Sequence, residues 1–329
     1  MIERVLERPE IWRIQVDLPQ NPLRMLNSYV ICVPEGNLVI DTGFNRPECR
    51  KALWDGLNEL GLDMGRTALF LTHLHSDHIG LAQDFAEIGC PIYMNPIDYN
   101  IFRSMKQGTM WPYLEEIFRD EGFPAEEIPR QATENQGRRY APDSVFPIEE
   151  VTDGTKLQLG ALELKCIHAP GHTPGQTLLY LPDEQILFSG DHILFDITPN
   201  INVWKDVPNP LEDYLCSLKK FRVLPIRYAL PAHRARQEDV YGRIDQIIEH
   251  HHGRLEEIWK IISQQPSTAP AIAAQIKWSA RGKSWNDFPS HQKWFAMGET
   301  LAHLYNLLHA GRAVREKTPQ GWNYIGIKE

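Results

Sequence analysis

The chain has 329 residues, of which 42% are hydrophobic and 23% charged, and these ordinary globular values exclude disordered and fibrous proteins. Its 34 Lys and Arg against 43 Asp and Glu give a net charge of −9, which disfavours a surface built for nucleic acid or an anionic membrane. No apolar stretch approaches the ~20 residues that span a bilayer. The N-terminus lacks the apolar core of a secretory signal, and the five cysteines are dispersed without C-x-x-C spacing. We therefore expect a cytoplasmic protein with reduced thiols.

The first hundred residues alternate between strand and helix patterns. Short β-like runs end in Gly or in polar loops, and the stretches between them carry apolar residues at helical spacing. The expected elements, in chain order, are strands at 11–16, 28–33 and 38–43, a helix at 47–60, a strand at 68–71, a helix at 79–88 and a strand at 91–94. The last three form a β-α-β unit.

Residues 95–150 interrupt this pattern and predict a helical insertion over one end of the core. Two or three short helices are expected at its start, and the Pro- and Gln-rich segment 124–145 is expected to be irregular. The insertion is rich in large apolar side chains, namely Tyr99, Phe102, Met105, Met110, Trp111 and Tyr113. They predict either an apolar lid over an acyl chain or ordinary helical packing.

After the insertion, two hairpins turn at Gly160 and at Pro182–Asp183, and a helix at 210–223 precedes a last strand at 228–230. Strand patterns largely stop beyond residue 238. The remaining pattern predicts helices at 240–263, 269–276 and 291–309 and a hairpin at 312–327. This change divides the chain into a strand-rich domain, residues 1–238, which we expect to be the catalytic one from the motifs described next, and a mainly helical domain, residues 239–329.

The motif His73-x-His75-x-Asp77-His78 carries the strongest chemical signal. On an extended backbone alternate residues point the same way, so His73 and His75 can hold one cation together. Asp77 and His78 are displaced enough to serve a second cation. Imidazole and carboxylate suit Zn²⁺ and, less selectively, Mn²⁺ or Fe.

Three further candidates each follow a predicted strand: His172 in PGHTPG, Asp191 in SGD and His233 in PAH. Functional loops of layered α/β proteins gather at one edge of the sheet, so these side chains are expected to converge. The expected ligands are His73, His75 and His172 for one ion, Asp77, His78 and His233 for the other, and Asp191 as the bridge.

Together with Asp41 in DTG, these motifs in this order resemble the metallo-β-lactamase superfamily of hydrolases over residues 11–235. The resemblance implies a four-layer αββα sandwich with a dinuclear metal centre at the shared edge. It also implies that Asp41 orients the histidine loop. Asp77 and Asp191 make the chain similar to the glyoxalase II and ribonuclease Z branch.

The C-terminal ~90 residues resemble the winged-helix tail of a group in that superfamily that includes an animal endoribonuclease. Residues 240–329 carry 11 Lys and Arg and 8 Asp and Glu, a net of +3, without a dense basic stripe. A packing role or a homodimer contact is therefore favoured over nucleic-acid binding.

These features predict a hydrolase in which a hydroxide bridging two divalent ions attacks a small ester or thioester, with zinc as the expected metal and manganese or iron as alternatives. Asp77 and Asp191 are expected to hold and orient the centre, and either water or His192 to protonate the leaving group. Two other functions stay open: a phosphodiesterase acting on single-stranded RNA, and a non-haem iron redox protein such as a persulfide dioxygenase.

Overall fold

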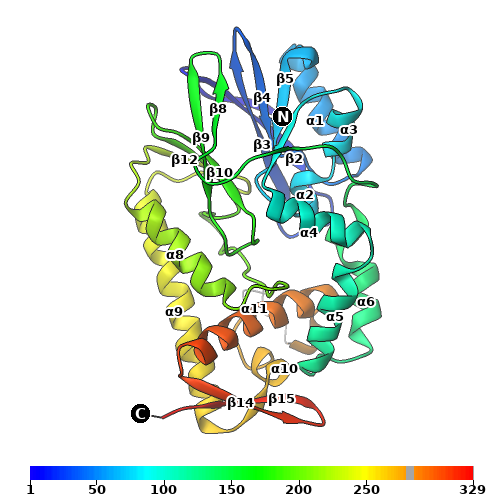
Figure 1. The fold of residues 1–329 in the computed structure, drawn as a ribbon, viewed down its shortest axis with the longest axis vertical. Helices are drawn as coiled ribbons and strands as arrows, with labels where there is room; N and C mark the ends of the chain where they lie inside the picture. The colour runs from blue at the N-terminus through cyan, green and yellow to red at the C-terminus, as the bar shows by residue number, and fades with distance from the viewer. Residues whose placement is uncertain (279–284, 329) are drawn as a thin grey trace.

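The computed structural model describes residues 1–278 and 285–328. Two β-sheets face each other in the upper half of Figure 1, and the C-terminal helices lie below them. The larger sheet has the order β1 (Ile2–Leu6), β2 (Glu10–Asp17), β3 (Met25–Val33), β4 (Gly36–Ile40), β5 (Thr67–Phe70), β6 (Ile92–Met94) and β7 (Glu149–Glu150). Its strands are antiparallel from β1 to β4 and parallel from β4 to β7.

The second sheet has the order β12 (Tyr228–Pro231), β11 (Ile186–Gly190), β10 (Thr177–Leu181), β9 (Leu162–His168) and β8 (Lys156–Leu159). Only its β11–β12 pair is parallel. The hairpins predicted at Gly160 and at Pro182–Asp183 are thus β8–β9 and β10–β11.

Strand alternation sorts side chains between the layers. On β3, Tyr29 and Ile31 lie in the core between the two sheets, whereas Val30 lies in the core on the other side. The rings of Tyr29 and Phe188 meet edge to face across the sheets at 5.5 Å. Because successive strand residues point to opposite faces, one strand serves two cores.

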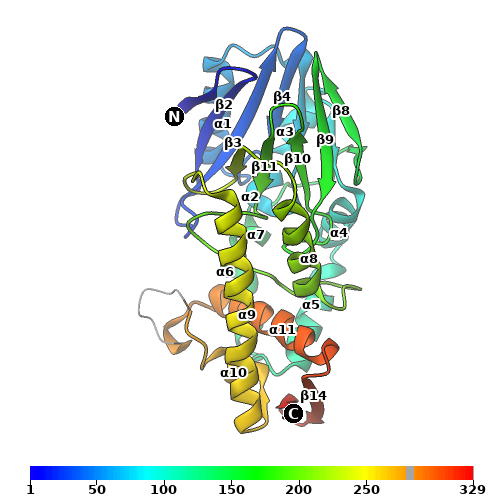
Figure 2. The same ribbon diagram turned by 90° about the vertical axis from the view of Figure 1, so that its left-hand side faces the viewer.

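Helices cover the outer face of each sheet. Helices α1 (Pro47–Glu59) and α3 (Ala82–Glu87) share a core with the seven-stranded sheet. Helices α8 (Pro210–Arg222) and α9 (Val240–Gln264) share a core with the other sheet, and they lie side by side in Figure 2. The predicted αββα sandwich is confirmed.

The insertion is more helical than its sequence predicts. It contains α4 (Pro96–Lys106), α5 (Met110–Asp120), α6 (Glu127–Glu134) and α7 (Gln136–Arg139). The prediction of an irregular 124–145 is wrong for α6 and α7. Helix α6 is held by a distant helix, since Glu127 pairs with Lys293 (2.6 Å) and accepts a hydrogen bond from Ser290. Phe102 and Met110 are buried core residues, which favours ordinary packing for these two.

The C-terminal region contains the predicted long helix α9, then α10 (Ala269–Ala273), the 3-10 turn η2 (Trp285–Asp287) and α11 (Ser290–His309). A small sheet of order β13 (Ser267–Thr268), β15 (Gly321–Gly326) and β14 (Ala313–Thr318) contains the predicted hairpin. Helix α11 packs on both α6 and α8, and Trp294 stacks on Phe118 of the insertion at 3.8 Å. The boundary at residue 238 stays a prediction.

Two details complete the fold. Strand β1 is not predicted from the sequence, because its residues, IERVL, include two charged side chains and lack a clear apolar alternation. It forms a strand at the edge of the sheet, where it pairs with β2. Among the described residues, no helix is both long and apolar enough to cross a membrane.

Candidate metal centre

The candidate ligands follow strand ends that lie at one edge of the sandwich. The loop 71–75 follows β5 and leads into α2 (Ser76–Ile79), which carries Asp77 and His78. The loops after β9, β11 and β12 carry His172, Asp191 and His233. Their neighbouring strands β10–β11–β12 fix these loops in space, so all seven predicted residues come together.

Three imidazoles form the first group, which we call the His73 group: His73, His75 and His172. His75 Nδ1 lies 3.0 Å from His73 Nε2 and 2.9 Å from His172 Nε2. His172 Nδ1 donates to the backbone oxygen of Asn200 at 2.8 Å, so its Nε2 presents a lone pair to the group. His75 is the half-buried member, whereas His73 and His172 are buried.

The second group, the His233 group, consists of Asp77, His78 and His233. His233 Nε2 lies 3.4 Å from Asp77 Oδ2, and its Nδ1 donates to the backbone oxygen of Met25 at 2.7 Å. This bond again directs Nε2 toward the centre.

Asp191 lies between the two groups. Its Oδ2 is 3.6 Å from His172 Nε2, and its Oδ1 is 3.6 Å from His78 Nε2 and 3.4 Å from His233 Nε2. One carboxylate oxygen therefore faces each group, as a bridging ligand requires.

Protonation differs between the groups. Burial lowers the pKa of His73 well below its usual value and that of His75 to about 3, and it also lowers the pKa of His172, so burial favours the neutral form of all three imidazoles. In the other group burial opposes protonation, but Asp191 and Asp77 outweigh it and raise the pKa of His233 to about 10. Buried Asp191 in turn has its pKa held well below its usual range by His233 and His78.

Several buried polar atoms at the centre lack a hydrogen-bond partner within the described chain, namely His78 Nε2, His233 Nε2 and Asp191 Oδ1. Such atoms cost free energy unless something satisfies them. The imidazole nitrogens and carboxylate oxygens form groups of three whose atoms lie within 4.8 Å of one another, and such groups suit divalent cations such as Zn²⁺. The donor set and its unpartnered atoms therefore fit metal ions.

Asp41 lies behind the histidine loop. Its carboxylate accepts hydrogen bonds from Thr72 N at 2.9 Å, from Thr72 Oγ1 at 2.7 Å and from His78 Nδ1 at 2.8 Å. The contacts match the orienting role that the family resemblance implies. Asp41 has φ of +60°, a conformation that Asp and Asn adopt more readily than most residues.

Sequence reasoning missed Asp98 of α4, which is fully buried. Its carboxylate accepts from Leu74 N at 2.9 Å, from Thr173 Oγ1 at 2.6 Å and from Gly175 N at 2.5 Å. It thereby joins the loop that carries His73 and His75 to the loop that carries His172. Burial raises the pKa of Asp98 to about 6. The sequence did contain a signal for this residue. Asp98 lies four positions before Phe102 and therefore on the same, apolar face of the predicted helix, where an acidic side chain is unusual.

His192 does not join the cluster. Its buried ring packs against Tyr214 and Phe221 of α8, with centroid distances of 4.9 and 5.2 Å. Burial lowers its pKa to about 3. The suggested role of His192 as a proton donor stays a prediction, and its surroundings are those of a core side chain.

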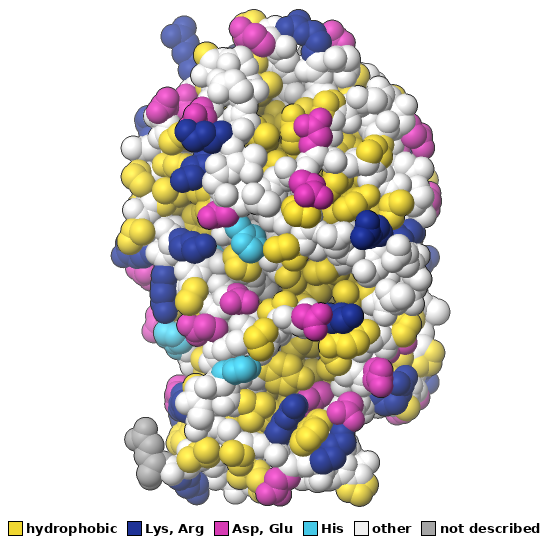
Figure 3. Space-filling view, viewed as in Figure 1, with side chains coloured by type: hydrophobic (Ala, Val, Ile, Leu, Met, Phe, Trp, Pro, Cys, Tyr) yellow, Lys and Arg dark blue, Asp and Glu magenta, His cyan; other side chains and the backbone are white. Residues whose placement is uncertain are grey.

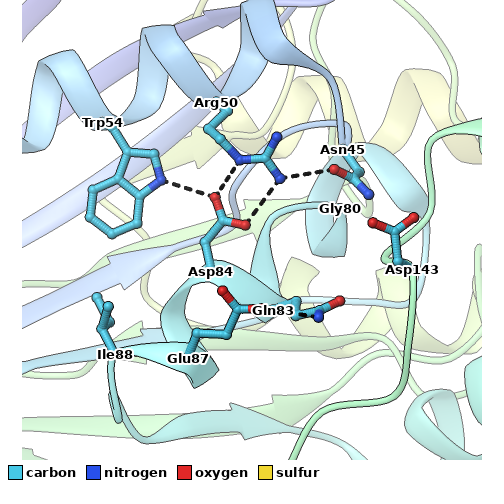
Figure 4. Close-up of a pocket in the computed structure, with 9 residues that line it drawn as sticks. All are labelled: Asn45, Arg50, Trp54, Gly80, Gln83, Asp84, Glu87, Ile88 and Asp143. Carbon is cyan, nitrogen blue, oxygen red and sulfur yellow. Dashed lines mark hydrogen bonds and ion pairs between the residues drawn. The ribbon is translucent and has the colours of Figure 1, made fainter.

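A cavity of about 450 Å³ lies elsewhere, between α1 and α3, and none of the candidate ligands lines it. Figure 4 shows Arg50 and Trp54 of α1 pointing at Asp84 of α3, with Arg50 Nε 2.6 Å from Asp84 Oδ2. Its central polar groups are therefore paired with each other.

The chain is similar to known proteins over both of its regions. Residues 22–233 match the metallo-beta-lactamase superfamily, and residues 255–324 match the metallo-beta-lactamase-like C-terminal domain. Similar solved structures include a metallo-beta-lactamase family protein from Thermus thermophilus (27% identity, TM-score 0.82, 96% of this chain and 98% of that one). A beta-lactamase domain protein from Burkholderia ambifaria is 26% identical (TM-score 0.83, 99% and 94% covered).

Two relatives with named functions or families are also similar to this chain. The beta-lactamase-like protein 2 homolog of Caenorhabditis elegans is 26% identical over 80% of this chain and 76% of its own. An atrochrysone carboxyl ACP thioesterase of Cryptosporiopsis sp. is 24% identical over 80% of this chain and 66% of its own, so the match spans about two thirds of the fungal protein.

Proposed function

Because this chain belongs to the metallo-β-lactamase superfamily, we propose that it is a dinuclear metal-dependent hydrolase, similar in chemistry to glyoxalase II, that acts on a small ester or thioester. The observation that carries the proposal is the convergence of seven side chains, of which His78, His233 and Asp191 each have a buried ligand atom without a hydrogen-bond partner in the described chain. The His73 group would hold one ion, the His233 group the other, and Asp191 both. Zinc is the proposed metal, with manganese and iron as alternatives.

Bound divalent ions would supply Lewis acidity and lower the pKa of a water molecule between them. The protein's own contribution is orientation. Asp191 presents carboxylate oxygens to both groups, and Asp77 presents one to the His233 group. Hydrogen bonds to the backbone oxygens of Asn200 and Met25 hold His172 and His233 in place. His75 marks the open side, because it is the half-buried ligand candidate.

An ester or thioester substrate is supported by the wall of the site. Trp204 is buried beside His75, with ring centroids 6.2 Å apart, and supplies an apolar surface at the open side. A relative named as an acyl-carrier-protein thioesterase adds support at 24% identity.

Phosphodiester substrates are disfavoured because three basic side chains, one from the insertion and two from the hairpin, are paired internally. Arg138 pairs with Glu115 at 2.8 Å, Arg315 with Glu121 at 2.9 Å, and Lys317 with Asp120. On the face shown in Figure 3, Lys and Arg are interspersed with acidic side chains rather than gathered in one stripe. RNA binding normally uses unpaired cations to contact phosphates.

For the C-terminal region we propose a winged-helix-like unit with a packing role. The order of α9, β13, α10, α11 and the β14–β15 hairpin supports the winged-helix resemblance. Its contacts with α5, α6 and α8 support packing over nucleic-acid binding. A homodimer contact and a cytoplasmic location stay predictions.

The test is a panel of acyl thioesters, esters, lactones, phosphodiesters and single-stranded RNA. Each compound is offered to metal-stripped protein and to protein reloaded with zinc, manganese or iron, with metal content measured alongside. We expect hydrolysis of a thioester or ester by reloaded protein only. Asp191→Ala should abolish it, whereas Asp196→Asn, an exposed change five residues away, should not. Turnover of RNA alone, oxygen consumption with iron, or no turnover in any sample would overturn the proposal.

A further inference from the structure

The segment from Ile193 to Asn209, which we call the 193–209 loop, connects Asp191 to α8 and contacts the metal centre twice. The backbone oxygen of Asn200 accepts the hydrogen bond from His172 Nδ1 at 2.8 Å. Trp204 packs beside His75. This loop therefore contacts two histidines of the His73 group and accepts the hydrogen bond that orients one of them, His172.

Helices of the C-terminal region hold this loop from its other side. Arg243 of α9 donates to the backbone oxygens of Leu194 at 2.6 Å and Ile197 at 2.9 Å. Glu299 of α11 accepts a hydrogen bond from the Asn200 side chain, Nδ2 to Oε2, at 2.9 Å. This hydrogen bond joins Asn200 and Glu299, which are 99 residues apart in sequence, directly behind His172.

The packing around Glu299 is close. Helix α11 approaches the loop so closely at Gly298 that a side chain there would clash. A Cβ at that position would lie 2.0 Å from Asn202 Oδ1. Glu299 itself is only 9% exposed. A buried carboxylate is costly unless it is hydrogen-bonded, and the Asn200 amide is the hydrogen-bond partner of its side chain that the structure describes.

We propose that Glu299 is a positioning residue for the metal centre: by holding Asn200 it fixes the carbonyl that orients the His172 imidazole toward the ion. The inference rests on the proposed metal-dependent function. Partners behind a metal-ligating histidine set its tautomer and ring orientation, and their loss typically costs about 10–100-fold in metal affinity. The C-terminal region therefore acts on the metal site without supplying a ligand.

The experiment uses the full chain and four variants. Glu299→Ala and Asn200→Ala remove the contact from either side, and Asn200→Ala keeps the backbone carbonyl. Glu299→Gln retains an acceptor oxygen. Thr300→Val is the matched control, since Thr300 is buried in the same helix and its hydroxyl donates to the backbone oxygen of Ala296 in that helix. Each stripped protein is titrated with Zn²⁺ against a competing chelator, and the Co²⁺-loaded form is examined by absorption spectroscopy.

We expect both alanine variants to bind one of two zinc ions about 10–100-fold more weakly, with an altered Co²⁺ spectrum. Glu299→Gln should recover most of the affinity, and Thr300→Val should match the wild type. If Glu299→Ala does not fold, Asn200→Ala decides the question. Wild-type affinity and spectrum in Asn200→Ala, even with a lowered melting temperature, would overturn the inference. A wild-type protein that takes up no metal would instead overturn the proposed function.

Discussion

Asp41 and His78 lie 37 residues apart in the chain, yet Asp41 Oδ2 is 2.8 Å from His78 Nδ1. The same carboxylate holds the backbone and hydroxyl of Thr72, which precedes His73. One buried side chain therefore orients the beginning and the end of the histidine motif.

Asp41→Asn should weaken metal binding by about 10–100-fold while leaving the fold intact. Asn tolerates the φ of +60° at this position, so the variant tests the carboxylate rather than backbone strain. The measurement is Zn²⁺ affinity by chelator competition, with circular dichroism to follow the fold. Unchanged zinc affinity would show that the Asp41 carboxylate does not orient the metal ligands.

Asp98→Ala should destabilise the metal-free protein and also weaken metal binding. The change leaves the buried N–H groups of Leu74 and Gly175 without their acceptor, at a cost of about 1–3 kcal/mol per group. Urea unfolding measures the first effect and zinc titration the second.

The matched control for Asp98 is Asp63→Ala. Asp63 also accepts a backbone N–H, from Gly65, but it is exposed and caps the N-terminus of the 3-10 turn η1 (Met64–Arg66). Its variant should keep wild-type metal affinity. Equal metal affinity in both variants would show that Asp98 does not hold the two loops in register.

His192→Phe should keep wild-type metal affinity and activity. Both ring nitrogens of His192 are buried without a hydrogen-bond partner in the described chain, so their removal should leave stability unchanged or raise it by up to about 1 kcal/mol. The same replacement at His172, a candidate ligand, should abolish metal binding in the His73 group. A large fall in kcat of His192→Phe at full metal content would restore the proton-donor role.

Stability of the metal-free protein should fall with acid through a buried histidine pair in the C-terminal region. His303 Nδ1 donates to Glu299 O at 2.7 Å, and its Nε2 lies 3.1 Å from His251 Nδ1. Burial lowers the pKa of His303 to about 3. The unfolded chain, with a histidine pKa near 6.5, therefore binds a proton between about pH 3 and 6.5 that the folded chain does not.

Folding stability linked to His303 is thus fully present above about pH 7 and is lost as the pH falls, by about 2 kcal/mol between pH 8 and pH 5. Urea unfolding across this range should show a shallower pH dependence for His303→Asn than for the wild type. His252→Asn, an exposed change on α9, should follow the wild-type curve. Identical slopes for all three proteins would show that His303 is not held neutral.

The ligand candidates could be read from the sequence because their pattern is local. His73 and His75 sit at alternate positions of an extended loop, Asp77 and His78 follow in the same motif, and His172, Asp191 and His233 lie in loops after apolar strands. Short-range geometry therefore already implies convergence. The strands and helices of the sandwich were readable for the same reason, since strand alternation and helical periodicity depend on near neighbours. Their αββα arrangement was implied instead by the resemblance to the metallo-β-lactamase superfamily.

The surroundings of the ligands were decided by contacts between distant parts of the chain. Asp98 meets Gly175 across 77 residues, and Asn200 meets Glu299 across 99. Helix α6 depends on α11 through Glu127 and Lys293, 166 residues apart. No periodicity records such pairs, because hydrogen bonds and ion pairs act over a few ångströms of space, and only the packed chain brings these atoms within that range.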